Sequence, residues 1–148
     1  MIGVNELVPM FLFTLLIGFC GFFGPSARNV EGMEGCYDDT CFLQSFEECS
    51  LSYGTINTDI VTIYMEVLGP NNQGTCDVYV RLDNINSSKV PDEYKTFSDV
   101  AKYSDMNCKL NNVQRDLLLS GQFNEELINN CEGSLATVLK SIAPQFNN

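Results

Sequence analysis

The sequence predicts an α+β fold, in which an N-terminal hydrophobic signal or transmembrane helix precedes a small disulfide-stabilised domain. That domain is expected to pack helices on an antiparallel hairpin or a three-stranded sheet. Three observations predict this: an uncharged apolar run at the start, six cysteines after it, and strand-like alternation followed by helical periodicity. The 148 residues suit two parts, a hydrophobic segment at 1–28 and an acidic cysteine-containing domain at 29–148.

The first part is an apolar run of 21 residues without a charge, and as a helix it spans about 30 Å, enough to cross a lipid bilayer. We therefore expect an export signal or, preferred here, a retained single-pass membrane anchor. Three alternatives stay open. The segment is cleaved before Ala27, with Gly24 and Ser26 as the small residues of the cleavage site, or it is a pilin-like leader cut after Gly3, or it is a buried core helix.

The charge balance excludes one class of partner. The chain has 19 acidic and 8 basic residues and a net charge of −11. Because nucleic-acid binding requires an excess of Lys and Arg, we expect no nucleic-acid partner. A protein partner with a basic surface fits the charge better, and self-association is a further possibility. The absence of His excludes Ser-His and Cys-His nucleophile pairs and imidazole metal sites.

An even number of cysteines after an export segment favours disulfides over free thiols. The alternatives are reduced, buried cysteines and a zinc site, but the cysteine spacings lack the close pairs that structural zinc requires. The six disulfide candidates are Cys36, Cys41, Cys49, Cys76, Cys108 and Cys131.

The first element expected in the domain is a helix over residues 40–49, whose apolar stripe contains Phe42 and Phe46. On this helix Cys41 and Cys49 share a face but lie about 12 Å apart. A disulfide requires Cα atoms within about 7 Å, so these two cysteines must each pair elsewhere.

The next elements are two strands at 59–68 and 75–82, joined by the turn sequence GPNNQG. The second strand alternates Cys76, Val78, Val80 and Leu82 with polar residues, which predicts an antiparallel hairpin with one buried face. Residues 105–110 are expected to add a third strand. It would bring Cys108 near Cys76 and make a bridge between them possible.

The stretch between the second and third predicted strands, residues 83–105, is polar and suits a solvent-facing loop. It contains the triplet Asn86-Ser87-Ser88, a possible N-glycosylation acceptor at Asn86. Residues 95–102 are mildly amphipathic and are expected to form a short helix or an edge strand.

Helical periodicity dominates the C-terminal part, with one helix at 113–119 and a second apolar pattern at 123–142. Gly133 is expected to kink or divide the second pattern. Its apolar face should cover the hairpin. Cys131, on that face, could bridge to the helix at 40–49.

The sequence carries no phosphate-binding glycine loop, no nucleophile elbow and no EF-hand pattern. It therefore predicts no catalytic, cofactor-binding or metal residues and no cofactor, although Glu34, Asp38 and Asp39 could bind calcium weakly. The acidic doublets are interpreted as solvated surface charge. They are Asp38-Asp39, Glu47-Glu48, Asp92-Glu93 and Glu125-Glu126.

These observations predict a non-enzymatic binding or structural domain outside the cytoplasm, either secreted or tethered to the membrane. One alternative is a pilin-like or envelope assembly subunit that uses its N-terminal helix for packing. The other is an extracytoplasmic hydrolase that works through carboxylates without His. The sequence identifies no ligand or partner beyond these classes.

Overall fold

The computed structural model describes part of the 148-residue chain, namely residues 34–36, 39–92, 95–119 and 124–142. The hydrophobic segment predicted at 1–28 lies outside the described residues. Within the described ranges, no helix combines the length and the hydropathy needed to cross a bilayer.

The described residues form one six-stranded sheet in the order β1-β2-β3-β4-β5-β6. The short β1 pairs parallel with β2, while β2 to β6 pair antiparallel with their neighbours. Every strand therefore lies next to its neighbour in sequence. The strands are β1 Glu34–Gly35, β2 Ser52–Asn57, β3 Val61–Pro70, β4 Cys76–Ile85, β5 Asp105–Leu110 and β6 Cys131–Glu132.

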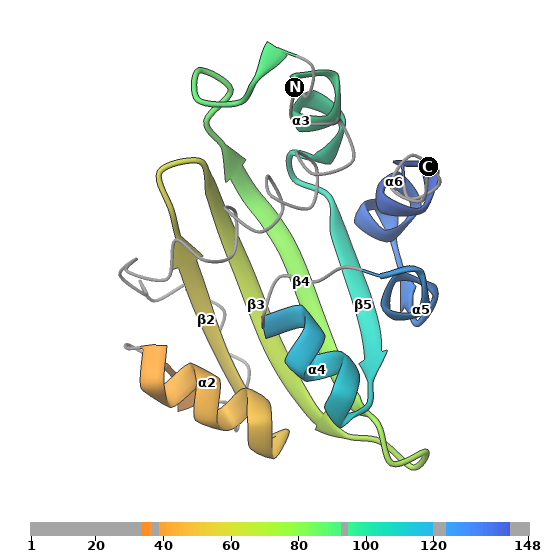
Figure 1. Ribbon diagram of the computed structural model, residues 1–148. Coiled ribbons are helices and arrows are strands. Elements are labelled where there is room, and N and C mark those ends of the chain that lie inside the picture. Colours follow the sequence, from red (N-terminus) through yellow and green to blue (C-terminus); the bar gives the residue numbers. More distant parts are fainter. Residues whose placement is uncertain (1–33, 37–38, 93–94, 120–123, 143–148) are drawn as a thin grey trace, which may run out of the picture.

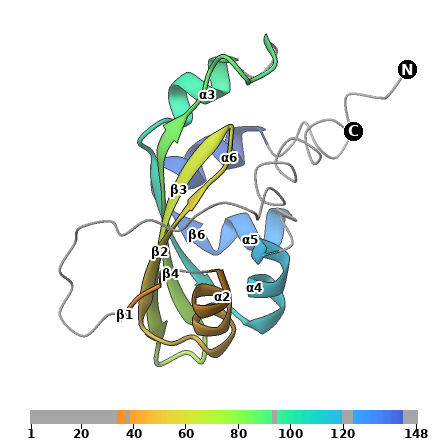
Figure 2. The same cartoon turned by 90° about the vertical axis from the view of Figure 1, so that its left-hand side faces the viewer.

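Helices lie mainly on one side of this sheet. Figure 1 shows α4 over the middle strands, α2 near β2, α5 and α6 beside β5, and α3 at the end of the sheet where β4 finishes. Figure 2 views the sheet nearly edge-on and shows α2, α4 and α5 on the same side. The helices are α2 Asp39–Glu48, α3 Lys95–Ala101, α4 Asn112–Leu119, α5 Glu125–Asn129 and α6 Ser134–Ile142.

The predicted hairpin and third strand are confirmed. Strands β3 and β4 pair antiparallel, and β5 adds to β4 in the same sense. In the connecting turn, the Asn71 side-chain oxygen accepts hydrogen bonds from the backbone N–H groups of Gln73 and Thr75, at 2.9 and 3.2 Å. Gly74 has a φ of +77°, which glycine adopts without strain. Turn chemistry and strand alternation therefore act together to fix the hairpin.

The core lies between the sheet and the helices. Met65, Val80 and Met106 stand opposite one another on three neighbouring strands, and all are buried. Phe42 and Phe46 of α2 are fully buried with ring centroids 5.9 Å apart, which confirms the predicted apolar stripe. The stretch at 95–102, for which the sequence left two possibilities, forms a helix, α3, over Lys95–Ala101.

The C-terminal pattern is divided at Gly133, as expected, into α5 and α6. Asn124 caps α5 by accepting a hydrogen bond from the backbone N–H of Leu127 at 2.8 Å. Between α5 and α6 lies the two-residue strand β6, which pairs with β5 and which the sequence did not predict. Strand β2 was also missed, because its sequence SYGTIN contains a glycine and shows no regular alternation.

Three disulfides join the six cysteines, as Cys36–Cys41, Cys49–Cys76 and Cys108–Cys131. Cys41 and Cys49 do pair elsewhere, as the helix geometry required. The suggested Cys76–Cys108 bridge and the suggested bridge from Cys131 to α2 are both wrong. Strand β6 places Cys131 directly opposite Cys108, while the start of β4 brings Cys76 to the end of α2.

Several intramolecular disulfides in one small domain indicate an oxidising, extracytoplasmic environment. They also show that these six sulfurs are consumed in bonds to one another and are not available as zinc ligands.

Candidate functional site

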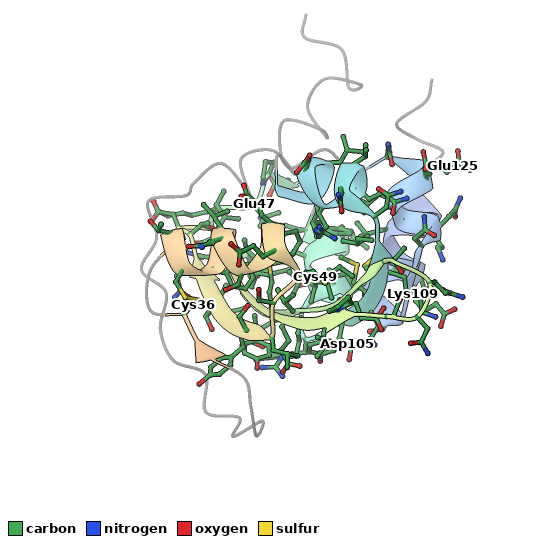
Figure 3. All side chains as sticks on the ribbon, turned by 90° about the horizontal axis from the view of Figure 1, so that it is seen from below. Cys36, Glu47, Cys49, Asp105, Lys109 and Glu125 are labelled. Carbon is green, nitrogen blue, oxygen red and sulfur yellow. A yellow bond between two sulfur atoms is a disulfide. The ribbon has the colours of Figure 1, made fainter. Side chains whose placement is uncertain are left out.

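A group of polar and aromatic side chains occupies the side of the sheet away from α2, α4 and α5. Cross-strand register brings the group together, because Tyr64 stands opposite Arg81, Glu66 opposite Tyr79, and Arg81 opposite Asp105. Figure 3 shows Asp105 on the opposite side of the sheet from Glu47 and the helices. We call this group the polar sheet face. Its members are Tyr64, Glu66, Tyr79, Arg81, Asp83 and Asp105.

A tyrosine and a carboxylate on β3 form the most buried part of the polar sheet face. The Tyr64 hydroxyl donates a hydrogen bond to Oε1 of Glu66 at 2.6 Å. Tyr64 is 0% exposed and Glu66 only 7% exposed. A carboxylate so poorly hydrated is stabilised by a short hydrogen bond of this kind, so the pair holds its geometry firmly.

Arg81 connects this pair to β4. Its guanidinium lies over the Tyr64 ring, 4.8 Å from the ring centroid, in a cation–π arrangement. It also donates two hydrogen bonds to the Asp83 carboxylate, from Nε at 2.5 Å and from Nη2 at 3.2 Å. The pKa of Arg81 is raised above its ordinary value, chiefly by the hydrogen bond to Asp83. The bidentate pair fixes the guanidinium plane against the ring.

Tyr79 completes the group towards β5. Its hydroxyl donates to Oδ2 of Asp105 at 3.2 Å, and its ring meets the Tyr64 ring edge-on at 6.4 Å between centroids. Burial raises the pKa of Tyr79, and the negative charge of Asp105 raises it further. The hydroxyl is therefore held as a neutral hydrogen-bond donor.

The rim of the polar sheet face is more exposed than its centre. Asn107 and Lys109 of β5 are exposed, and Leu68 of β3 is 40% exposed. A hollow of about 250 Å³ lies beside these residues and extends to Asp77 and Glu132. Small-molecule sites usually have volumes of about 300–1,000 Å³, so this hollow is small for a buried ligand.

No protein family, curated protein or solved structure matches this chain. The polar sheet face is therefore interpreted from its own geometry.

The residues that the sequence singled out are not brought together. Glu47 and Glu48 end α2, whereas Glu125 and Glu126 lie in the first turn of α5. Asn86 lies in a turn just after β4. Asp38 and the side chains of Glu34 and Asp39, suggested as weak calcium ligands, lie outside what the structure describes.

The polar sheet face was not predicted as a site, although the sequence contained part of its signal. The residues between the apolar positions of the second predicted strand are Asp77, Tyr79 and Arg81, and the alternation places them together on its other face. Tyr64 and Glu66 follow the same two-residue spacing in the preceding strand. Register between the strands was the missing information. Among the described residues, no group of three or more Cys, Asp or Glu side chains could hold a metal ion.

Proposed function

We propose that the chain is a non-enzymatic extracytoplasmic binding domain that engages a basic protein partner through the polar sheet face. The observation that carries this proposal is the interlocked arrangement of two tyrosines, one arginine and three carboxylates on the side of the sheet away from α2, α4 and α5. Tyr79 and Arg81 are the half-buried members of this group, and Tyr and Arg are, with Trp, enriched among the energetically dominant residues of protein interfaces.

The side chains of the polar sheet face are already ordered by contacts with one another. Ordering a rotamer-rich side chain at an interface costs about 0.5–1.5 kcal/mol, and a face fixed in advance avoids much of this cost. A side of a sheet is broad, and it suits a protein partner better than a small ligand enclosed in a pocket.

The charge of the face supports a basic partner. Its three carboxylates, on Glu66, Asp83 and Asp105, outnumber the single guanidinium of Arg81, and the chain as a whole carries a net charge of −11. A positively charged surface is therefore steered towards it, and the association is expected to weaken as salt rises.

The location of the domain is proposed from two features. The three disulfides support an oxidising environment outside the cytoplasm. We infer from the apolar sequence at 1–28 that this segment exports the domain or anchors it to the membrane. The assembly-subunit and hydrolase alternatives stay predictions from the sequence.

Site-specific photo-crosslinking in cells that produce the full chain tests this function. A photoreactive residue replaces exposed Asn107 at the rim of the polar sheet face or, as the matched control, exposed Glu125 on α5. We expect a discrete adduct with a basic protein from position 107 and none from position 125. The yield should fall when NaCl is raised and in the double variant Asp83→Asn/Asp105→Asn.

Equal adducts from both positions, or none from position 107, would contradict the use of this face. If the adduct yield changed neither with salt nor in the double variant, the polar sheet face would still be the binding surface. The proposal that the partner is basic would then be wrong.

A further inference from the structure

We propose that Asn86 is an N-glycosylation acceptor, presented to the transferase by the folded domain. This inference goes beyond the binding function and shares with it only the extracytoplasmic location. Asn86-Ser87-Ser88 is the one Asn-X-Ser/Thr triplet in the 148-residue sequence. A triplet alone is common by chance, so the argument rests on how the fold displays this one.

The acceptor lies at the junction between the sheet and an exposed turn: the Asn86 N–H still donates to the Ile60 carbonyl oxygen at 2.7 Å, and the turn follows it. Strand β4 ends at Ile85, and residues 87–89 form a turn in which the Lys89 N–H donates to the Asn86 carbonyl oxygen at 2.9 Å. Ser87 and Ser88 are exposed and Asn86 is half-buried. Figure 1 shows this segment at the end of the sheet, beyond the tip of β4. An enzyme can approach such a turn without disrupting strand pairing.

Hydrogen bonds set the orientation of the Asn86 carboxamide. Its Oδ1 accepts from the Ser88 hydroxyl at 2.6 Å and from the Ser88 backbone N–H at 3.3 Å. This is an Asx-turn, which the third residue of the triplet completes through its own hydroxyl. Ser88, the third residue of the acceptor triplet, therefore holds Oδ1 of Asn86 against the backbone.

The nitrogen that would react is only lightly engaged. Nδ2 carries two hydrogens, and one of them is donated to the Asp59 carbonyl oxygen at a long 3.4 Å. Releasing this contact costs little compared with breaking a short hydrogen bond.

The surface beside Asn86 has room and polarity for the first sugar. An open hollow of about 590 Å³ lies between the turn before β3 and the turn after β4, and Thr58, Asp59, Thr62 and Asn84 contribute to its lining. The Asp59 carboxylate lies at the surface, 3.2 Å from Nζ of Lys89. Hydroxyl, amide and carboxylate groups of this kind form hydrogen bonds with sugar hydroxyls.

The reaction balances with a polyprenyl-pyrophosphate-linked oligosaccharide as the donor. A bond forms between Nδ2 and the anomeric carbon of the first sugar. The bond from that carbon to the phosphate oxygen breaks, and the lipid pyrophosphate leaves with the electron pair. One Nδ2 proton passes to a base of the transferase.

The test uses the full chain, purified in detergent with its three disulfides formed. It is incubated with this donor and a single-subunit oligosaccharyltransferase that accepts Asn-X-Ser, and intact mass is measured. We expect one added oligosaccharide on the wild type and on Ser87→Ala. We expect at least a tenfold lower yield on Ser88→Ala and no product on Asn86→Gln.

A reduced and unfolded sample of the wild type shows whether the triplet alone is sufficient for modification or whether the folded turn affects it. Modification of the unfolded chain but not of the folded chain would overturn the proposal, because the fold would then hide the acceptor. Failure of both samples, or equal yields from Ser87→Ala and Ser88→Ala, would overturn it as well. None of these outcomes affects crosslinking from Asn107, so the two proposals fail independently.

Discussion

Arg115 of α4 donates a hydrogen bond from Nη2 to the main-chain carbonyl oxygen of Glu47, near the end of α2, at 3.0 Å. The same nitrogen donates to the Asn112 side chain at 2.9 Å, while Nε has no acceptor among the described residues. Helix α2 has no basic residue in its own last turn. A cation from another helix therefore compensates the negative end of the α2 dipole and joins the two helices.

The first prediction concerns this contact. Arg115 is 8% exposed, so its replacement in Arg115→Met retains much of the packing but removes the charge-assisted hydrogen bonds. We expect the free energy of unfolding to fall by about 1.5–3 kcal/mol, measured by urea denaturation. The exposed Lys109→Met is the control and should change stability by less than about 0.5 kcal/mol. Unchanged stability in Arg115→Met would mean that the cost of burying the unbonded Nε offsets both hydrogen bonds.

The second prediction orders the disulfides by the length of chain that each one closes. The Cys49–Cys76 bond spans 27 residues, whereas Cys36–Cys41 spans 5. In the chain-entropy model these bonds stabilise the domain by about 3.5 and about 2 kcal/mol, respectively. We therefore expect the double alanine variant of the longer bridge to melt at a distinctly lower temperature than that of the shorter one. The reverse order in differential scanning calorimetry would contradict the entropic account.

The third prediction contrasts two glycines with positive φ. At Gly133, with φ of +124°, an added Cβ would lie 2.6 Å from the main-chain oxygen of Asp105, whereas at Gly74 nothing lies within 4 Å. Gly74→Ala should cost about 1 kcal/mol from backbone conformation alone. Gly133→Ala must also displace β5, so we expect a clearly larger loss in chemical denaturation. Equal losses would mean that β6 and β5 separate easily.

The sequence was sufficient to predict those helices and strands whose patterns depend only on residues close together in the chain. Alternation and the GPNNQG turn predicted the hairpin, and the periodicity of apolar residues predicted α2 and α4. Cysteine pairing could not be predicted in the same way, because it depends on contacts distant along the chain. Cys131 meets Cys108 only because Gly133 interrupts the C-terminal helices and leaves two residues to pair with β5.

The polar sheet face could not be predicted from the sequence for the same reason, because it depends on contacts between strands. Alternation placed Tyr79 and Arg81 on one side of a strand, but a single strand does not reveal its neighbours. The register of β3 against β4 sets Tyr64 opposite Arg81, and that of β4 against β5 sets Arg81 opposite Asp105. A shift of one residue in either register would separate these groups onto opposite sides of the sheet.

The last prediction uses the ionisation of Tyr79 on the polar sheet face. Its pKa is raised in the folded state, first by burial and then by Asp105, above the ordinary value of 10.0. Because the folded state favours the protonated phenol, this stabilisation is fully present below about pH 10 and is lost as pH rises through the higher folded-state pKa. We expect the free energy of unfolding to fall in that alkaline range, and to fall less in Tyr79→Phe.

Two variants separate the causes. Asp105→Asn removes the carboxylate but leaves the burial, so ultraviolet difference titration should show the pKa of Tyr79 lowered towards its ordinary value without reaching it. Tyr103→Phe, which removes a hydroxyl from a side chain that is 70% exposed, should leave the Tyr79 transition in place. A titration curve that Asp105→Asn does not move would show that the 3.2 Å hydrogen bond has no effect on the phenol in solution. Tyr79 would then not be linked to Asp105 through its hydroxyl.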